Sequence, residues 1–159
     1  MKIGIFVHSQ SGNTAKLGLA VTHSLREKGH DVSIELLRPL GKVHPRVKQV
    51  DFRAVPDPAE YEAVIFGGPI WAFSASPVLV SLLKQLPTLK GKKALCFTTS
   101  GFPTPISGAK RAIKRINELL DVLGATVLPG VPLFWGIYCG KKRLDATVGQ
   151  ICGLILKTT

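Results

Sequence analysis

The sequence predicts an α/β fold, namely a doubly wound sandwich on a five-stranded parallel sheet in the order 2-1-3-4-5. Short apolar runs typical of buried strands alternate with segments whose apolar residues recur at helical spacing. Such alternation requires crossover connections and a parallel sheet that is covered on both faces. The chain has 159 residues, of which 45% are hydrophobic, so we expect one domain over residues 1–159 with a large core.

Strands are expected where apolar residues run together or alternate. Ile3–Val7, Tyr61–Phe66 and Lys92–Thr98 contain continuous apolar runs, which indicate strands buried on both faces. Asp31–Leu37 alternates between apolar and polar residues and supplies the second strand. We expect the fifth strand over Thr126–Val131.

Four helices are expected from apolar residues that share one face. The first follows the first strand and ends at Gly29, a favoured residue just past a helix end. The second begins at Ser76, a hydroxyl N-cap followed by Pro77, and runs to about Leu86. The third spans about Ala109–Leu123, and the last spans about Arg143–Leu156.

Positive charge is the unusual feature of the composition, with a formal net charge of +11 at pH 7. Cations dominate residues 38–58, a proline-rich stretch that we expect to be a long loop, with a short extra strand near residues 50–55. Other cations gather on two helices, at Lys110, Arg111, Lys114, Arg115, Lys141, Lys142 and Arg143. They suit either a solvated surface or an anionic partner, such as the 2′-phosphate of NADPH or an acidic redox protein. No nucleic-acid-binding motif is present, so we expect no nucleic-acid partner.

Several classes of protein are disfavoured. There is no apolar run of membrane-spanning length and no signal-peptide pattern, so a cytoplasmic protein without a membrane span is expected. Cys96, Cys139 and Cys152 are too widely spaced for a disulfide framework, a zinc site or an iron–sulfur cluster, and Cys96 is expected in the core. No Ser-His-Asp or paired-carboxylate arrangement stands out, so we expect neither a metal nor a catalytic side chain.

The candidate site comes from three loops. Ligands of this fold bind beyond the carboxyl ends of the first, third and fourth strands. Residues 9–14 form a hydroxyl-rich strand-to-helix loop, which suits either an anion at a helix N-terminus or a simple N-capped turn. Residues 68–73 and 99–102 add glycines and aromatic side chains. Together the loops suit a planar heteroaromatic ligand with a phosphate tail.

Other phosphate-binding motifs are missing. There is no G-x-G-x-x-G after the first strand and no G-K-[ST], which argues against dinucleotide Rossmann and P-loop sites. The chain lacks the acids of a phosphoacceptor domain and a cysteine in the first loop for a thiol phosphatase.

These stretches resemble those of flavodoxins and flavodoxin-like FMN proteins. Ser9–Thr14 looks like their S/T-x-S/T-G-N-T phosphate loop. Tyr61–Trp71 looks like their third strand and flavin loop, and Lys92–Phe102 looks like their fourth strand with its T-T-S-G ending. The resemblance covers nearly the whole chain and implies a flavodoxin-like fold with non-covalently bound FMN.

The resemblance also implies the residues of the site. The phosphate would be held by Ser9, Gln10, Ser11, Gly12, Asn13 and Thr14. The flavin ring would be lined by Pro69, Ile70, Trp71, Ala72 and Phe73. Its pyrimidine side and other face would be approached by Thr99, Ser100, Gly101 and Phe102.

Some features depart from electron-carrying flavodoxins. Those proteins are strongly acidic, whereas this chain is basic. The Gly-x-Pro turn ending at Pro69 looks more like that of the NAD(P)H:quinone reductase branch, whose members usually have Gly where Phe73 stands. A bulky residue there disfavours the peptide flip that stabilises one-electron reduction in flavodoxins. The chain also lacks the insertion after strand four that helps that branch form tetramers.

The resemblance therefore implies an FMN-dependent oxidoreductase that passes electrons from NAD(P)H or a reduced protein to a quinone or another small acceptor. One alternative is a non-enzymatic, flavodoxin-type electron carrier with an acidic redox partner. Another is a flavin-fold binding protein that has lost FMN. A homodimer is compatible with each of these interpretations.

Overall fold

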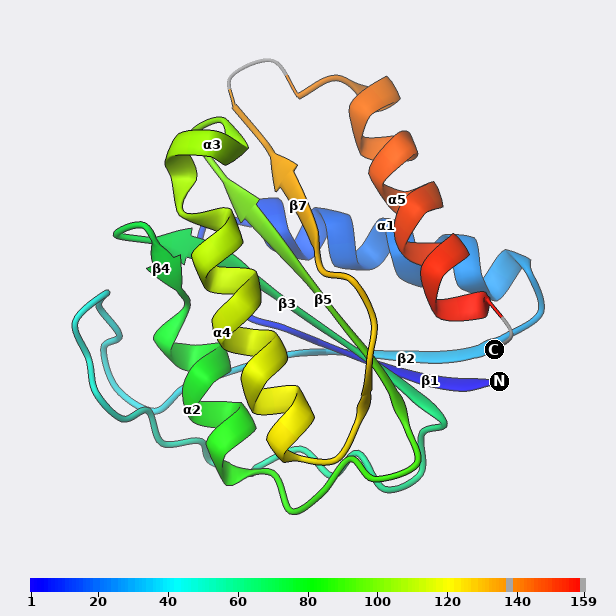
Figure 1. Cartoon of the computed structure of the whole chain (residues 1–159), viewed down its shortest axis with the longest axis horizontal. Coiled ribbons are helices and arrows are strands. Elements are labelled where there is room, and N and C mark those ends of the chain that lie inside the picture. Colours follow the sequence, from blue (N-terminus) through cyan, green and yellow to red (C-terminus); the bar gives the residue numbers. More distant parts are fainter. Residues whose placement is uncertain (137–138, 158–159) are drawn as a thin grey trace.

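The computed structural model describes residues 1–136 and 139–157, and it shows one sheet between two layers of helices (Figure 1). In chain order the elements are β1 (Lys2–Val7), α1 (Asn13–Glu27), β2 (Asp31–Leu36), β3 (Ala63–Trp71), β4 (Ser74–Ala75), α2 (Pro77–Gln85), β5 (Lys93–Ser100), α3 (Thr104–Ser107), α4 (Ala109–Val122), β6 (Thr126–Val127), β7 (Val131–Phe134) and α5 (Lys141–Leu156).

The strand order confirms the predicted topology. The sheet runs β2-β1-β3-β5-β6, and β7 pairs with β5 farther along the same edge. All of these pairs are parallel, so β5 is the fourth strand of the predicted order, and β6 and β7 share the fifth position. Helices α1 and α5 cover one face, while α2 and α4 cover the other (Figure 1).

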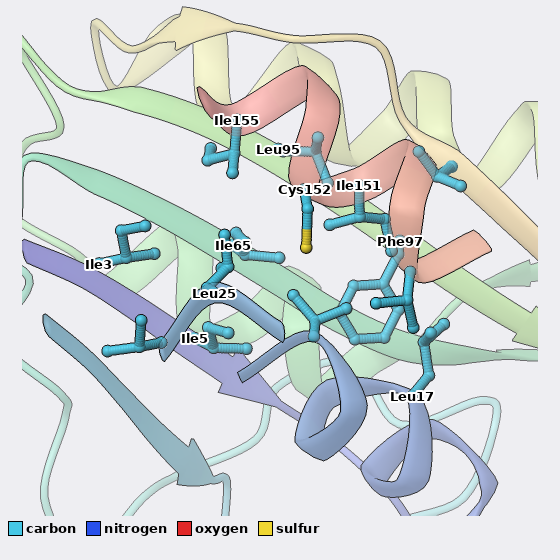
Figure 2. Close-up of a cluster of buried hydrophobic side chains, with 14 of the residues drawn as sticks. Ile3, Ile5, Leu17, Leu25, Ile65, Leu95, Phe97, Ile151, Cys152 and Ile155 are labelled. Atoms are coloured by element: carbon cyan, nitrogen blue, oxygen red, sulfur yellow. The ribbon is translucent and has the colours of Figure 1, made fainter. Parts of the chain in front are cut away.

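Each face of the sheet has its own apolar core. Alternate strand residues such as Ile5, Ile65 and Phe97 pack against α1 and α5 (Figure 2). The intervening residues, among them Phe66 and Cys96, pack against α2 and α4. Cys96 is fully buried, as predicted, and burial raises the pKa of its thiol to about 12, so it stays protonated at neutral pH.

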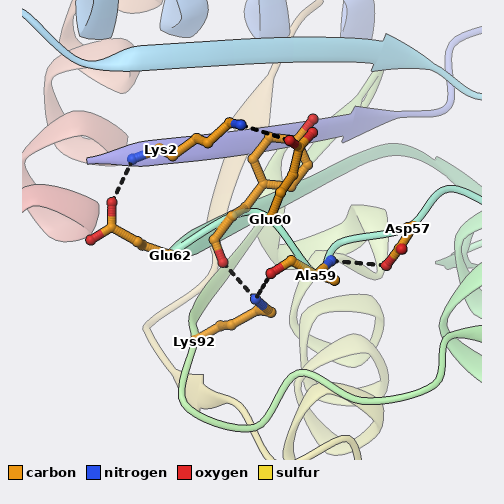
Figure 3. Close-up of polar contacts among 7 residues, drawn as sticks. Lys2, Asp57, Ala59, Glu60, Glu62 and Lys92 are labelled. Carbon is orange, nitrogen blue, oxygen red and sulfur yellow. Dashed lines mark hydrogen bonds and ion pairs between the residues drawn. The ribbon is translucent and has the colours of Figure 1, made fainter.

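Polar contacts join the amino ends of β1 and β5 to the segment that leads into β3 (Figure 3). Lys2 Nζ pairs with Glu60 Oε2 at 2.6 Å, and Lys2 N–H donates to Glu62 Oε2 at 2.7 Å. Lys92 Nζ donates to the carbonyls of Ala59 and Tyr61. Such exposed contacts contribute little stability individually, and here they order the chain that leads into β3.

Two strand predictions are wrong in extent. The third strand continues past Phe66 to Trp71, because its later residues still pair with β5 and then form a hairpin with β4. The fifth strand is not one segment over residues 126–131, since β7 runs on to Phe134. Pairing is interrupted before β7 at Gly130, where a Cβ atom would clash with the side chain of Ile113.

Residues 37–62, all of which are described, contain no helix, as predicted. The short strand expected near residues 50–55 is wrong, because only an isolated bridge joins Pro39 to Phe52. The loop is nonetheless held against α2, since Val50 N–H donates to Ser81 Oγ at 3.0 Å and Gln85 Nε2 donates to the Val50 carbonyl at 2.9 Å. None of the described helices is both long and apolar enough to cross a membrane.

Candidate functional site

The three loops that the sequence brings to one edge meet at a cavity of about 380 Å³. It lies beyond the carboxyl ends of β1, β3 and β5. Its lining residues are Ser11, Asn13, Pro69, Ile70, Trp71, Thr99, Ser100, Gly101, Trp135 and Gly136. The walls are therefore aromatic, apolar and neutral polar, and none of the described lining residues carries a charged side chain.

The first loop presents unpaired backbone donors at the start of α1. Gly12 has φ +93°, a left-handed conformation that favours glycine, and Ser9 Oγ accepts from Gly12 N–H and Ala15 N–H, both at 3.2 Å. Among the described residues, the N–H groups of Gln10, Ser11, Asn13 and Thr14 have no acceptor. The first turn of α1 contains no acid, so the positive end of the helix dipole is left uncompensated.

A buried hydrogen bond joins the first loop to the third. Thr14 is 2% exposed, and its Oγ1 lies 2.7 Å from Thr99 Oγ1. Either hydroxyl can be the donor. This bond fixes the spacing between the start of α1 and the end of β5, so Thr14 acts on the cavity by holding its two sides in place.

His8, which follows β1, contacts Trp71 of the second loop and Ser76 at the start of α2. Ser76 Oγ caps α2 by accepting from Val78 N–H and Leu79 N–H, which leaves its hydrogen for His8 Nδ1, 2.7 Å away. Burial lowers the pKa of His8 to about 4, so the imidazole is neutral near pH 7. Its ring packs edge to face with Trp71, at 4.9 Å between centroids, and this contact positions one wall of the cavity.

The tip of the β3–β4 hairpin is strained. Ala72 and Phe73 connect the paired residues Trp71 and Ser74, and their φ angles are +48° and +62°. Positive φ at both central positions matches a type I′ turn, which prefers Asn-Gly. Gly108 lets this tip pack closely, because a Cβ atom there would clash with the Phe73 carbonyl oxygen.

The predicted site residues do not all line one cavity. Ala72, Phe73 and Phe102 line a smaller neighbouring cavity of about 250 Å³, where the two phenyl rings stack with centroids 6.4 Å apart. Ser9 and Gln10 line a separate cavity of about 440 Å³ that also touches His8 and Trp71. Gly12 and Thr14 shape the first loop instead of lining a cavity. The other predicted residues line the cavity of about 380 Å³ described first, which we call the main cavity.

Trp135 and Gly136 line the main cavity but were missed by sequence reasoning. Trp135 N–H donates to the Ser100 carbonyl at 2.7 Å, which joins the loop after β7 to the loop after β5. The signal was available, since Trp135 follows the carboxyl end of a parallel strand. It was missed because the fifth strand was expected to end at Val131. Tyr138, which follows shortly after in the sequence, lies outside the described residues.

Metal chemistry has no ligand set in the part of the chain that the structure describes, where no three His, Cys, Asp or Glu side chains gather as a metal site would require. The arrangement instead offers aromatic walls for a flat ring and backbone donors for an anion.

The chain matches no family model and no curated protein sequence. It does match solved structures over most of its length. A flavodoxin from Streptococcus pneumonia TIGR4 superposes with a TM-score of 0.70 at 15% identity, covering 98% of this chain and 97% of that one. Oxidised flavodoxin 1 from Bacillus cereus gives 0.67 at 17% identity, with 94% of each chain covered.

A flavoprotein in complex with FMN from Lactobacillus acidophilus NCFM gives a TM-score of 0.61 at 18% identity, covering 82% of this chain and 91% of that one. At such low identity these likenesses establish the fold alone. Together with the strand order 2-1-3-4-5, they show that the chain has a flavodoxin-like fold.

Proposed function

We propose that this chain binds FMN non-covalently in the main cavity and acts as an FMN-dependent oxidoreductase, passing electrons from NAD(P)H or a reduced protein to a quinone or another small acceptor. The observation that carries the proposal is a single cavity lined both by two tryptophans and by residues at a helix N-terminus whose N–H groups have no acceptor among the described residues. Bound FMN supplies electron and hydride transfer, while the protein supplies positioning and electrostatics.

The donors fit a phosphate monoester. Ser11 and Asn13 line the cavity, and their N–H groups have no acceptor among the described residues. A dianion there would receive charge-assisted hydrogen bonds and would also compensate the dipole of α1. The left-handed conformation of Gly12 turns the chain from this loop into α1.

The remaining walls fit a flat ring. Trp71 and Trp135 provide large aromatic surfaces, and Thr99, Ser100 and Gly101 provide polar groups along the third loop. The hydrogen bond from Trp135 N–H to Ser100 fixes the loops that carry these groups. A ring seated between them would be oriented by stacking against these aromatic side chains.

The hairpin tip favours a reductase over an electron carrier. Flipping the peptide between Ala72 and Phe73 would convert a type I′ turn into a type II′ turn, which normally has glycine at its first central position. Ala72 occupies that position, so the flip is costly. We therefore infer that the protein does not favour one-electron reduction by this device. The flavodoxins among the similar structures keep an electron carrier as the second candidate.

The purified protein should show flavin absorption bands, or acquire them with FMN, and denaturation should release FMN. Steady-state assays of the loaded protein with NADH and NADPH across several quinones should show turnover, and an anaerobic redox titration should show one two-electron step. Absence of turnover would contradict the enzymatic role, and two resolved one-electron steps would support the carrier. Uptake of no FMN by folded protein would support the third interpretation, a binding protein of this fold.

A matched variant sharpens the redox titration. Ala72→Gly opens the backbone conformation that the flip requires, without changing any aromatic wall. We expect it to separate the two one-electron steps relative to the unaltered chain. Superimposable titrations would show that the turn does not control the redox steps.

A further inference from the structure

A pocket of about 360 Å³ lies on the other side of the β3–β4 hairpin from the proposed flavin cavity. Lys48, Arg111 and Arg115 line it, and we call it the cationic cleft. The rest of its lining is largely apolar and includes Val47 and Val80. Strand β4 contributes Ser74 and Ala75 and packs beside α4, which carries the two arginines (Figure 1).

No acidic side chain lines the cleft in the part of the chain that the structure describes. Arg111 and Arg115 are four residues apart on α4, a spacing at which like charges destabilise a helix. None of the ion pairs among the described residues involves Arg111, Arg115 or Lys48. The helix tolerates this because its opposite, apolar face is buried through Ala112, Ile116 and Leu120.

Another side of α4 provides a contrast. Lys114 pairs there with Glu118 at 4.0 Å, and both residues line a different groove beside β6 together with Lys110. That groove is therefore lined by acids as well, Glu118 and Asp121, whereas the charged residues that line the cleft are all cations. Lys48 reaches the cleft from the loop after β2, and the hydrogen bonds of Val50 to α2 hold this loop in place.

We propose that the cationic cleft binds a dianionic phosphomonoester on an adenine dinucleotide, so that the protein prefers NADPH to NADH. Two guanidinium groups and an ammonium group suit phosphate oxygens, to which arginine donates two parallel hydrogen bonds. The apolar lining residues suit the adjoining base. NADH carries no phosphomonoester and would gain nothing from the three cations. This inference rests on the proposed function for what the nicotinamide end does.

The hairpin places the cleft within reach of the flavin cavity. Ile70 and Trp71 line the cavity, and their partners across the hairpin, Ala75 and Ser74, line the cleft. Neighbouring strands lie only about 4.8 Å apart. One extended dinucleotide can therefore cross the hairpin with its phosphomonoester in the cleft and its nicotinamide beside the cavity.

The test is calorimetric binding of NADP⁺ and NAD⁺ at low ionic strength, on the FMN-loaded and the FMN-free chain. We expect NADP⁺ to bind about tenfold more tightly or better, since one charge-assisted hydrogen bond is worth about that factor. R111A/R115A should abolish the difference, and K48A, from a separate element, should reduce it. K110A/K114A removes the same charge from the same helix outside the cleft and should keep the preference.

Equal affinities in the unaltered chain, or equal losses in the cleft and control variants, would overturn the inference. Inorganic phosphate should compete with NADP⁺ and not with NAD⁺, and failure to compete would also count against it. If instead a polyglutamate peptide binds through Arg111 and Arg115 while NADP⁺ shows no advantage, the cleft serves an acidic protein. FMN uptake is read separately by absorbance, so failure of the proposed function is distinguishable from failure of this inference.

Discussion

The molecule carries two candidate anion sites that work by different physics. The first loop uses backbone N–H groups and a helix dipole, held by buried bonds such as the one between Thr14 and Thr99. The cationic cleft uses Arg111, Arg115 and Lys48, whose exposed side chains have no ion-pair partner among the described residues. Fixed dipoles pay little ordering entropy on binding, whereas long side chains must be ordered. The first loop should therefore discriminate between anions, whereas salt should readily screen the charges of the cationic cleft.

The largest effect is expected from an acid in the first loop. Ser11→Asp places a carboxylate among the free N–H groups, where it would take their hydrogen bonds and repel phosphate. We expect FMN affinity to fall about a thousandfold, equivalent to the loss of two charge-assisted hydrogen bonds of about 2 kcal/mol each. The same carboxylate should stabilise α1 by about 0.5 kcal/mol through its dipole.

Flavin fluorescence titrations and thermal unfolding measure these opposite effects. Ser11→Ala is the control and should change both quantities little. Riboflavin, which lacks the phosphate, should bind the two variants equally. Normal FMN affinity in Ser11→Asp would show that the phosphate does not sit at this loop.

The next effect is a pH dependence from His8. Its pKa is lowered by burial to about 4 from an ordinary 6.5, so the unfolded chain takes up this proton first as the pH falls. Stability from the neutral imidazole is complete above about pH 7 and is lost as the pH falls toward 4, by about 3 kcal/mol at pH 4.

His8→Asn cannot titrate in this range but can still accept the hydrogen bond from Ser76. Its denaturant-unfolding free energy should therefore lose about 3 kcal/mol less than that of the unaltered chain between pH 7 and pH 4. Parallel pH profiles for the two proteins would refute a neutral, buried His8.

A smaller loss of stability is expected when the hydrogen bond between the first and third loops is removed. Thr14→Val leaves the buried Thr99 hydroxyl unpaired, which costs about 1–2 kcal/mol of unfolding free energy. Replacing both residues by Val removes both polar groups and should recover much of that loss. Additive losses in this double-mutant cycle would mean that the two hydroxyls do not interact.

Ionic strength should have the smallest effect on binding, and this effect should differ between the first loop and the cationic cleft. Raising the ionic strength from about 0.01 to 0.5 M shortens the screening length from about 30 Å to less than 10 Å. We expect the preference for NADP⁺ over NAD⁺ to fall several-fold, while the ratio of FMN to riboflavin affinity changes much less. Equal salt dependence in calorimetry would remove the distinction between the sites.

Much of the fold could be predicted because strands buried on both faces read as apolar runs. Apolar residues of such runs, for example Ile5, Ile65 and Leu95, are buried in the core. The edge strand was less predictable, because it stops at Val127 and resumes at Val131, and the close packing of Gly130 against Ile113 in that gap follows only from the folded chain. Because the fifth strand was expected to end too early, at Val131, Trp135 was not recognised as a residue at its carboxyl end.

The candidate site shows the same limit. The first loop could be recognised because Gly12 and its hydroxyl neighbours have local reasons to be there. The turn at Ala72 and Phe73 carries neither Asn nor Gly, so nothing in the sequence signals a type I′ hairpin. The bond between Thr14 and Thr99 joins residues 85 positions apart and follows only from the folded sheet.

In the proposed mode of binding, one cavity holds a flat ring at its tryptophan walls and a phosphate at the start of α1. Parallel titrations of the purified, flavin-free chain with FMN and riboflavin, followed by flavin fluorescence, test it most directly. We expect binding of one FMN per chain, with strong quenching by Trp71 and Trp135, and riboflavin binding at least about a hundredfold weaker. Equal affinity for the two flavins, or binding of neither by the folded chain, would contradict it.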